Sequence, residues 1–84
     1  MYELLLERSV ARQLKQVPDA DYQRLIARVR LLTESPRPPA CKKLRGSRAD
    51  YRLRVGDWRI VYEVDDERRI VRILRVALRK EVYR

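Results

Sequence analysis

Histidine is absent from this 84-residue chain, and cysteine occurs only once, at Cys41. A zinc site needs several such ligands and a Ser-His-Asp triad needs a histidine. Zinc catalysis, histidine acid–base chemistry and triad hydrolysis are therefore excluded. A single cysteine also excludes an internal disulfide and suits a reducing cytoplasm. We expect neither a metal nor a small-molecule cofactor.

Long apolar runs are missing as well. No stretch approaches the roughly 20 residues that span a bilayer. The N-terminal segment Tyr2–Leu6 is too short for a signal peptide, and the acidic residues Glu3 and Glu7 interrupt it. Repeats and low-complexity tracts are also absent, and 45% apolar residues are enough for folding. We expect one small domain over residues 1–84, located in the cytoplasm and without membrane contact.

Positive charge is abundant and unevenly distributed, with a net charge of +9. Residues 1–40 contain seven Lys or Arg and five Asp or Glu, whereas residues 41–84 contain fourteen and seven. A basic half-domain is typical of proteins that bind a polyanion. Charge alone leaves RNA, DNA, an acidic protein partner and solubility open.

The first half of the chain predicts a strand followed by two helices. The strand covers residues 2–7, and Ser9 is a candidate N-cap for a helix with an apolar stripe at Val10, Leu14 and Val17. Pro18 ends this helix and begins a second one. The predicted buried face of the second helix is Tyr22, Leu25, Ile26, Val29 and Leu32. We expect an antiparallel helical hairpin on a sheet, followed by a loop from Ser35 to about residue 49.

From Tyr51 the apolar period changes to two, which is typical of strands. Gly56-Asp57 is a two-residue hairpin turn of type I′ or II′, and such a turn fixes the strand register. The predicted core pairs are Val55 with Trp58, Leu53 with Ile60, and Tyr51 with Tyr62. A third strand at Ile70–Ala77 is apolar on both faces, as in an interior strand, but its register is not determined. The order β-α-α-β-β-β predicts an α+β fold with three antiparallel strands in a meander.

The same register places arginines on the other face of the hairpin. Arg54 lies across from Arg59, and Arg52 lies two residues along the same side. Opposed like charges destabilise a sheet by about 0.2–1 kcal/mol, so stability alone would favour another residue at one of these positions. One interpretation is a solvated face whose arginines extend into water. The other is a pocket for an anion such as phosphate.

Three motifs, in this order and spacing, resemble the RelE-type mRNA interferases of the RelE/ParE superfamily of toxins. They are Lys43-Leu44-Arg45-Gly46, the run from Asp50-Tyr51-Arg52-Leu53-Arg54 through Trp58-Arg59-Ile60-Val61-Tyr62, and Arg79-Lys80-Glu81-Val82-Tyr83. The predicted element order is similar too. The resemblance implies the toxin of a type II toxin–antitoxin system, with a cognate antitoxin and mRNA on the ribosome as partners.

The resemblance also implies a metal-free endoribonuclease, in which the ribose 2′-OH attacks the adjacent phosphate. The corresponding catalytic residues are Arg52, Arg54, Arg59, Arg79 and Tyr83. Some relatives have lysines at the first two of these positions, and many have a histidine where this chain has Leu78. The site is therefore rich in groups that stabilise charge and poor in groups that transfer protons.

Several other residues have two interpretations. Lys42, Lys43 and Arg45 in the loop are candidate RNA contacts or solvated charges. Trp58 and Tyr62 are expected to pack in the core rather than stack on bases, and Cys41 is expected to be an incidental thiol.

Two other functions remain open at this point. One is a ParE-like toxin that inhibits DNA gyrase and has no nuclease activity. Such toxins share the fold but generally lack the basic set retained here. The other is an inactive toxin fold that acts as a binding module with its antitoxin.

Overall fold

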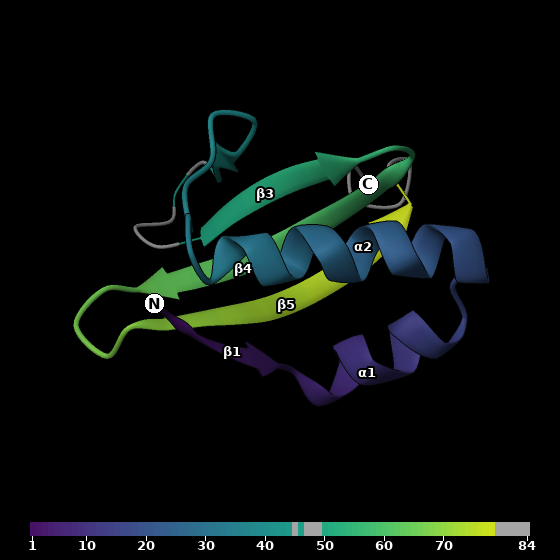
Figure 1. The fold of residues 1–84 in the computed structure, drawn as a ribbon, viewed down its shortest axis with the longest axis horizontal. Helices are drawn as coiled ribbons and strands as arrows, with labels where there is room; N and C mark the ends of the chain where they lie inside the picture. The colour runs from purple at the N-terminus through teal and green to yellow at the C-terminus, as the bar shows by residue number, and fades with distance from the viewer. Residues whose placement is uncertain (45, 47–49, 79–84) are drawn as a thin grey trace.

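The computed structural model describes residues 1–44, 46 and 50–78. Its elements follow the predicted order, with one additional short strand (Figure 1). They are β1 (Glu3–Leu6), α1 (Arg8–Lys15), α2 (Asp19–Leu32), β2 (Lys42–Lys43), β3 (Asp50–Val55), β4 (Trp58–Asp65) and β5 (Ile70–Leu78). The predicted α+β class is confirmed. In the described part of the chain, no helix is both long and apolar enough to cross a membrane.

All five strands belong to one sheet, in the order β1-β5-β4-β3-β2. β1 runs parallel to β5, and the other neighbours are antiparallel. β5 is therefore an interior strand, as its apolar residues on both faces predicted. The two helices cover the same face of this sheet (Figure 1), with α1 against β5 and α2 against β3. The opposite face remains available for a site.

The helices are held to the sheet by the predicted apolar stripes. Val10, Leu14 and Val17 are buried, as are Leu25, Val29 and Leu32 of α2, while Tyr22 and Ile26 pack against this core. Asp19 and Asp21 occupy the first turn of α2, where the helix dipole favours negative charge. The predicted buried faces of both helices are confirmed.

The predicted cap of the first helix is wrong. Ser9 is the second residue of α1, and the N-cap is Glu7, whose backbone is extended at φ −63° and ψ 152°. β1 ends at Leu6, so the chain must turn into the helix immediately afterwards. The connection between the strand and the helix therefore sets the N-cap at Glu7, two residues before the serine.

The β3–β4 hairpin has the predicted register throughout. Val55 pairs with Trp58, Leu53 with Ile60, and Tyr51 with Tyr62. Gly56 has a φ of +61°, whereas Asp57 does not have a positive φ. A positive φ at the first loop residue alone selects the type II′ turn from the two predicted types.

The predicted loop before the hairpin contains a strand. Lys42 and Lys43 form β2, which pairs with Arg52 and Tyr51 of β3, so the sheet has five strands where the sequence predicted four. A two-residue strand is too short to show a period of two, and it follows a proline-rich segment that indicates irregular structure. The pairing was therefore not visible in the sequence.

Candidate nucleic-acid interface

Cations gather on the sheet face that lies away from the helices. Partners across a sheet point to the same side, so the pairings define two rows. One row is Lys42, Arg52, Val61 and Arg75, and the other is Arg54, Arg59 and Ala77. We call Lys42, Arg52, Arg54, Arg59 and Arg75 together the arginine face. It joins residues from β2, β3, β4 and β5 in one surface.

Arg59 lies within this surface and is almost fully buried. Its exposed fraction is 5%, and its Nε and Nη1 atoms are shielded from solvent. It lies between Arg54 on β3 and Ala77 on β5. A buried guanidinium loses much of its hydration and therefore gains strongly from an anion placed beside it.

Arg54 is held in a defined orientation at the end of the hairpin. It is exposed, and its Nε donates a hydrogen bond to the Gly56 carbonyl oxygen at 3.1 Å. Arg52 is half-buried in the neighbouring row. Planar guanidiniums in fixed positions suit bidentate contact with phosphate oxygens.

The arginine face ends at a row that contains acidic groups. Glu63 pairs with Asp50 on one side and with Arg72 on the other, and its Oε1 lies 4.0 Å from Nη1 of Arg72. Within the part of the chain that the structure describes, the arginine face therefore occupies the half of the sheet nearest the hairpin turn, and the acidic row lies beyond it. Among the described residues, no group of three His, Cys, Asp or Glu is placed to hold a metal ion.

The structure brings together part of the predicted set. Arg52, Arg54 and Arg59 share one face, and Lys42 joins them, whereas Lys43 pairs with Tyr51 and so lies on the opposite side of the sheet. The remaining predicted residues, Arg45, Arg79 and Tyr83, lie outside the described residues.

Arg75 is the member of the arginine face that the sequence did not predict. A β-bulge interrupts the β4–β5 register, because Val61 pairs with Arg75 while the next residue, Tyr62, pairs with Ile73. The extra residue, Leu74, places Arg75 and Arg72 on the same face although they are three residues apart. Simple alternation gives no sign of this shift.

The aromatic residues of β4 serve the core, as predicted. Trp58 is partly buried against the core, and its Nε1 donates to Asp21 Oδ2 at 3.1 Å. Tyr62 is fully buried and its hydroxyl donates to the Pro36 carbonyl oxygen at 2.7 Å. Burial raises the pKa of the Tyr62 hydroxyl far above its usual range, and a hydrogen bond with the Cys41 side chain adds to this effect. Cys41 itself is half-buried against the core.

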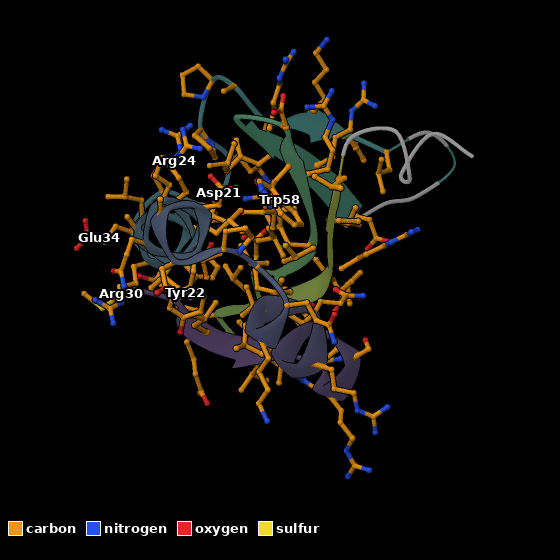
Figure 2. All side chains as sticks on the ribbon, turned by 90° about the vertical axis from the view of Figure 1, so that its right-hand side faces the viewer. Asp21, Tyr22, Arg24, Arg30, Glu34 and Trp58 are labelled. Carbon is orange, nitrogen blue, oxygen red and sulfur yellow. The ribbon has the colours of Figure 1, made fainter. Side chains whose placement is uncertain are left out.

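A polar network fixes the hairpin to α2. The two Asp21 oxygens accept from Arg24 Nη2 at 2.6 Å and from Trp58. Figure 2 shows Asp21 and Trp58 between helix and sheet, with Arg24 at the outer edge of the helix. The Arg24 guanidinium, and then the Trp58 indole, hold the pKa of Asp21 below its usual value. The hairpin that presents Arg54 and Arg59 is thus anchored from the helix side.

Comparison with known proteins places this chain in a family. A model described as the ParE toxin of the type II toxin–antitoxin system parDE matches residues 4–83. The chain belongs to this toxin family. The resemblance to the RelE/ParE superfamily is thereby confirmed, and so is the assignment as a toxin of a type II toxin–antitoxin system.

Solved structures of RelE proteins are similar over almost the whole chain. A chain of the archaeal RelE–RelB complex from Pyrococcus horikoshii is 29% identical, with a TM-score of 0.84, covering 93% of this chain and 94% of its own. The isolated RelE toxin of E. coli is 29% identical, with a TM-score of 0.83 and coverage of 99% and 92%. A chain of the RelBE2 toxin–antitoxin complex from Mycobacterium tuberculosis is 28% identical, with a TM-score of 0.81 and coverage of 93% and 98%.

Proposed function

We propose that this toxin is a metal-independent endoribonuclease that cuts mRNA on the ribosome. The observation that supports this most strongly is the arginine face, with the buried Arg59 beside Arg54 on a sheet face that the helices leave open. Similarity to RelE toxins supports the same activity. The substrate in this proposal is the ribose-phosphate backbone of translated mRNA.

In the proposed reaction the mRNA supplies its own nucleophile. The ribose 2′-oxygen forms a bond to the adjacent phosphorus while the bond from phosphorus to the 5′-oxygen breaks. The products are a 2′,3′-cyclic phosphate and a 5′-hydroxyl. Negative charge accumulates on the phosphate oxygens in the transition state, and preorganised guanidiniums stabilise such charge. Arg52, Arg54 and Arg59 provide this stabilisation, and Arg75 holds the strand.

Proton transfer is the weak part of this chemistry. One proton must leave the 2′-OH and one must reach the departing 5′-oxygen, but an arginine has a pKa above about 12 and is a poor base. Arg79 and Tyr83 are proposed to complete the site, with Tyr83 stacking on a base or hydrogen-bonding near the scissile phosphate. Positioning of the mRNA by the ribosome supplies the remaining acceleration through orientation.

The other basic residues near β2 divide between two roles in this proposal. Lys42 extends the arginine face at its β2 edge and contacts the mRNA backbone. Lys43, on the opposite side of the sheet edge, and Arg45 contact ribosomal RNA. Neither role requires recognition of a particular nucleobase.

The second proposed partner is a cognate antitoxin, and the two proteins are proposed to meet in the cytoplasm. RelE proteins from Pyrococcus horikoshii and Mycobacterium tuberculosis occur in structures with their antitoxins. An acidic antitoxin segment lying on the arginine face would neutralise it and exclude mRNA. The uneven charge of the chain is consistent with such a partner.

A ParE-type action on DNA gyrase, without nuclease activity, is the alternative. It is favoured by the matching family model, which is that of the ParE toxin. The retained set of arginines on one sheet face favours the nuclease.

Induced expression with mapping of mRNA 5′ ends distinguishes the two functions. The nuclease predicts new 5′-hydroxyl ends within translated reading frames soon after induction. A supercoiling assay with gyrase is run in parallel, and unchanged supercoiling is expected. Gyrase inhibition with intact mRNA would contradict the proposal.

A further inference from the structure

A second basic site lies beside the hairpin turn, at the edge of β3. It is a hollow of about 410 Å³ between α2 and the end of β3, lined by Arg24, Ala27, Arg28, Arg54, Val55 and Gly56. β2 pairs with β3 only at Tyr51 and Arg52, so it stops short of this part of the edge. Two of the three arginines come from the helix and are not part of the arginine face.

Two of these guanidiniums are held at the same turn. Arg24 Nη2 contacts Asp21 at 2.6 Å, and Asp21 is itself fixed by the Trp58 indole. A Cβ built on Gly56 would lie 3.5 Å from Nη2 and 3.6 Å from Nη1 of Arg24, so this guanidinium rests against the turn. Arg54 approaches the turn as well, through its bond to the Gly56 carbonyl. Both groups are therefore oriented before any ligand binds.

The hollow has a surplus of positive charge. Asp21 balances Arg24, but in the ranges 1–44, 46 and 50–78 no carboxylate lies within 4.0 Å of Arg28 or Arg54. The rest of the lining is small or apolar, at Ala27, Val55 and Gly56. Several guanidinium forks around a small hollow with apolar walls suit a compact, multiply hydrogen-bonding anion.

We propose that this hollow binds one phosphate group of the RNA backbone, outside the phosphate that is cleaved. Arg54 belongs both to the hollow and to the arginine face, where it lies across from Arg59. An RNA strand on the open face can therefore continue past the hairpin end and around the β3 edge. Arg24 and Arg28 then act as strand-positioning residues. This inference rests on the proposed function, because it takes the arginine face as the path of the RNA.

The test measures binding separately from cleavage. The probe is a fluorescent RNA oligonucleotide with 2′-O-methyl groups, which has no 2′-OH to react, and the Kd is determined by anisotropy at several salt concentrations. Arg28→Gln is the main variant, because no acidic partner of this side chain is lost. Arg30→Gln is the matched control. Figure 2 shows Arg24 and Arg30 on opposite sides of α2, and Arg30 does not line the hollow.

Arg28→Gln should weaken RNA binding roughly tenfold, as expected for loss of a hydrogen bond to a charged group. The slope of log K against log salt should become shallower by about 0.7, which corresponds to one phosphate of a single strand. Arg24→Gln should act in the same direction, and Arg30→Gln should leave both quantities unchanged. An Arg28→Gln protein that melts like the wild type and binds RNA with the same affinity and slope would overturn the inference.

Nuclear magnetic resonance identifies the ligand class. The amide signals of Val55 and Gly56 should shift saturably with the RNA and with inorganic phosphate, and Arg28→Gln should abolish both shifts. A response to phosphate but not RNA, or only to a glutamate-rich peptide, would overturn the RNA assignment. The outcome is independent of catalysis. A toxin that binds RNA through the hollow but leaves mRNA intact would remove the proposed function and leave this site standing.

Discussion

At the scale of single residues, the opposed pair Arg54 and Arg59 shows which properties of the arginine face follow from the sequence. A two-residue turn fixes the register, so the sequence alone places these residues across from each other. It does not predict that Arg59 is 5% exposed while Arg54 remains in solvent. That difference depends on neighbours from other strands. One residue of the pair is therefore a buried charge and the other an accessible one.

A second cluster of single residues ties distant segments together. Arg37 Nη2 and Nη1 donate to Asp66 Oδ2 and Oδ1 at 2.7 and 3.2 Å, and the Tyr2 hydroxyl donates to Asp66 at 2.6 Å. Arg37 Nε also donates to the Tyr51 hydroxyl at 2.9 Å. The Arg37 guanidinium, and then the Tyr2 hydroxyl, hold the pKa of Asp66 below its ordinary value of 3.8.

Asp66→Asn should lower the free energy of unfolding at pH 7, because the charged hydrogen bonds to Arg37 are lost. The pKa of Asp66 is lower in the folded than in the unfolded protein. Its contribution is therefore present above pH 3.8 and lost as the pH falls through the folded-state pKa. Denaturant melts at neutral to mildly acidic pH should show a constant difference in the free energy of unfolding between wild type and variant. This difference should disappear as the pH falls through the folded-state pKa of Asp66. A gap that persists at the lowest pH would contradict the role of the carboxylate, and Glu67→Gln, an exposed neighbour, is the control.

At the scale of elements, local patterns determine what the sequence predicts. Both helices, the β3–β4 hairpin and the interior place of β5 follow from apolar periodicity and turn chemistry. β2 and the bulge in β5 depend on pairing between strands, and no local pattern encodes either of them. For the site, Arg52, Arg54 and Arg59 were therefore predictable together, and Arg75 was not.

The contact between α1 and β5 gives a test at this scale. The Val76 backbone N–H donates to Gln13 Oε1 of α1 at 2.8 Å, and Val76 is 2% exposed. Gln13→Ala would leave this buried donor without its partner, which costs about 1–3 kcal/mol. Denaturant melts should detect that loss, whereas Gln23→Ala, at an exposed position on α2, should melt like the wild type. Equal stability of Gln13→Ala and the wild type would mean that this bond between α1 and β5 does not stabilise the fold.

At the scale of the whole molecule, the fold separates the packed face of the sheet from the proposed binding face. The helices cover one sheet face and build the core there, while the opposite face gathers cations from four strands. A face that binds several phosphates releases counterions, so affinity must fall with salt. This salt dependence is a property of the whole surface and not of one residue.

RNA binding by the purified toxin should therefore depend strongly on salt. If about four phosphates are neutralised, the slope of log K against log salt should be near −3 for a single strand. Anisotropy titrations of a non-cleavable RNA between low and moderate salt give this slope. A flat response would favour a protein partner such as gyrase over RNA.

The central claim is that the arginine face is the catalytic surface, and Arg59→Ala tests it most directly. The measurement is the single-turnover rate of mRNA cleavage on translating ribosomes, with melts to verify folding and Arg30→Ala as the control. If Arg59 stabilises the transition state, its loss should lower the rate by roughly 10²–10³-fold, as for removal of an oxyanion-hole donor. Arg30→Ala should cleave like the wild type. A folded Arg59→Ala toxin that cuts mRNA at the wild-type rate would contradict the account.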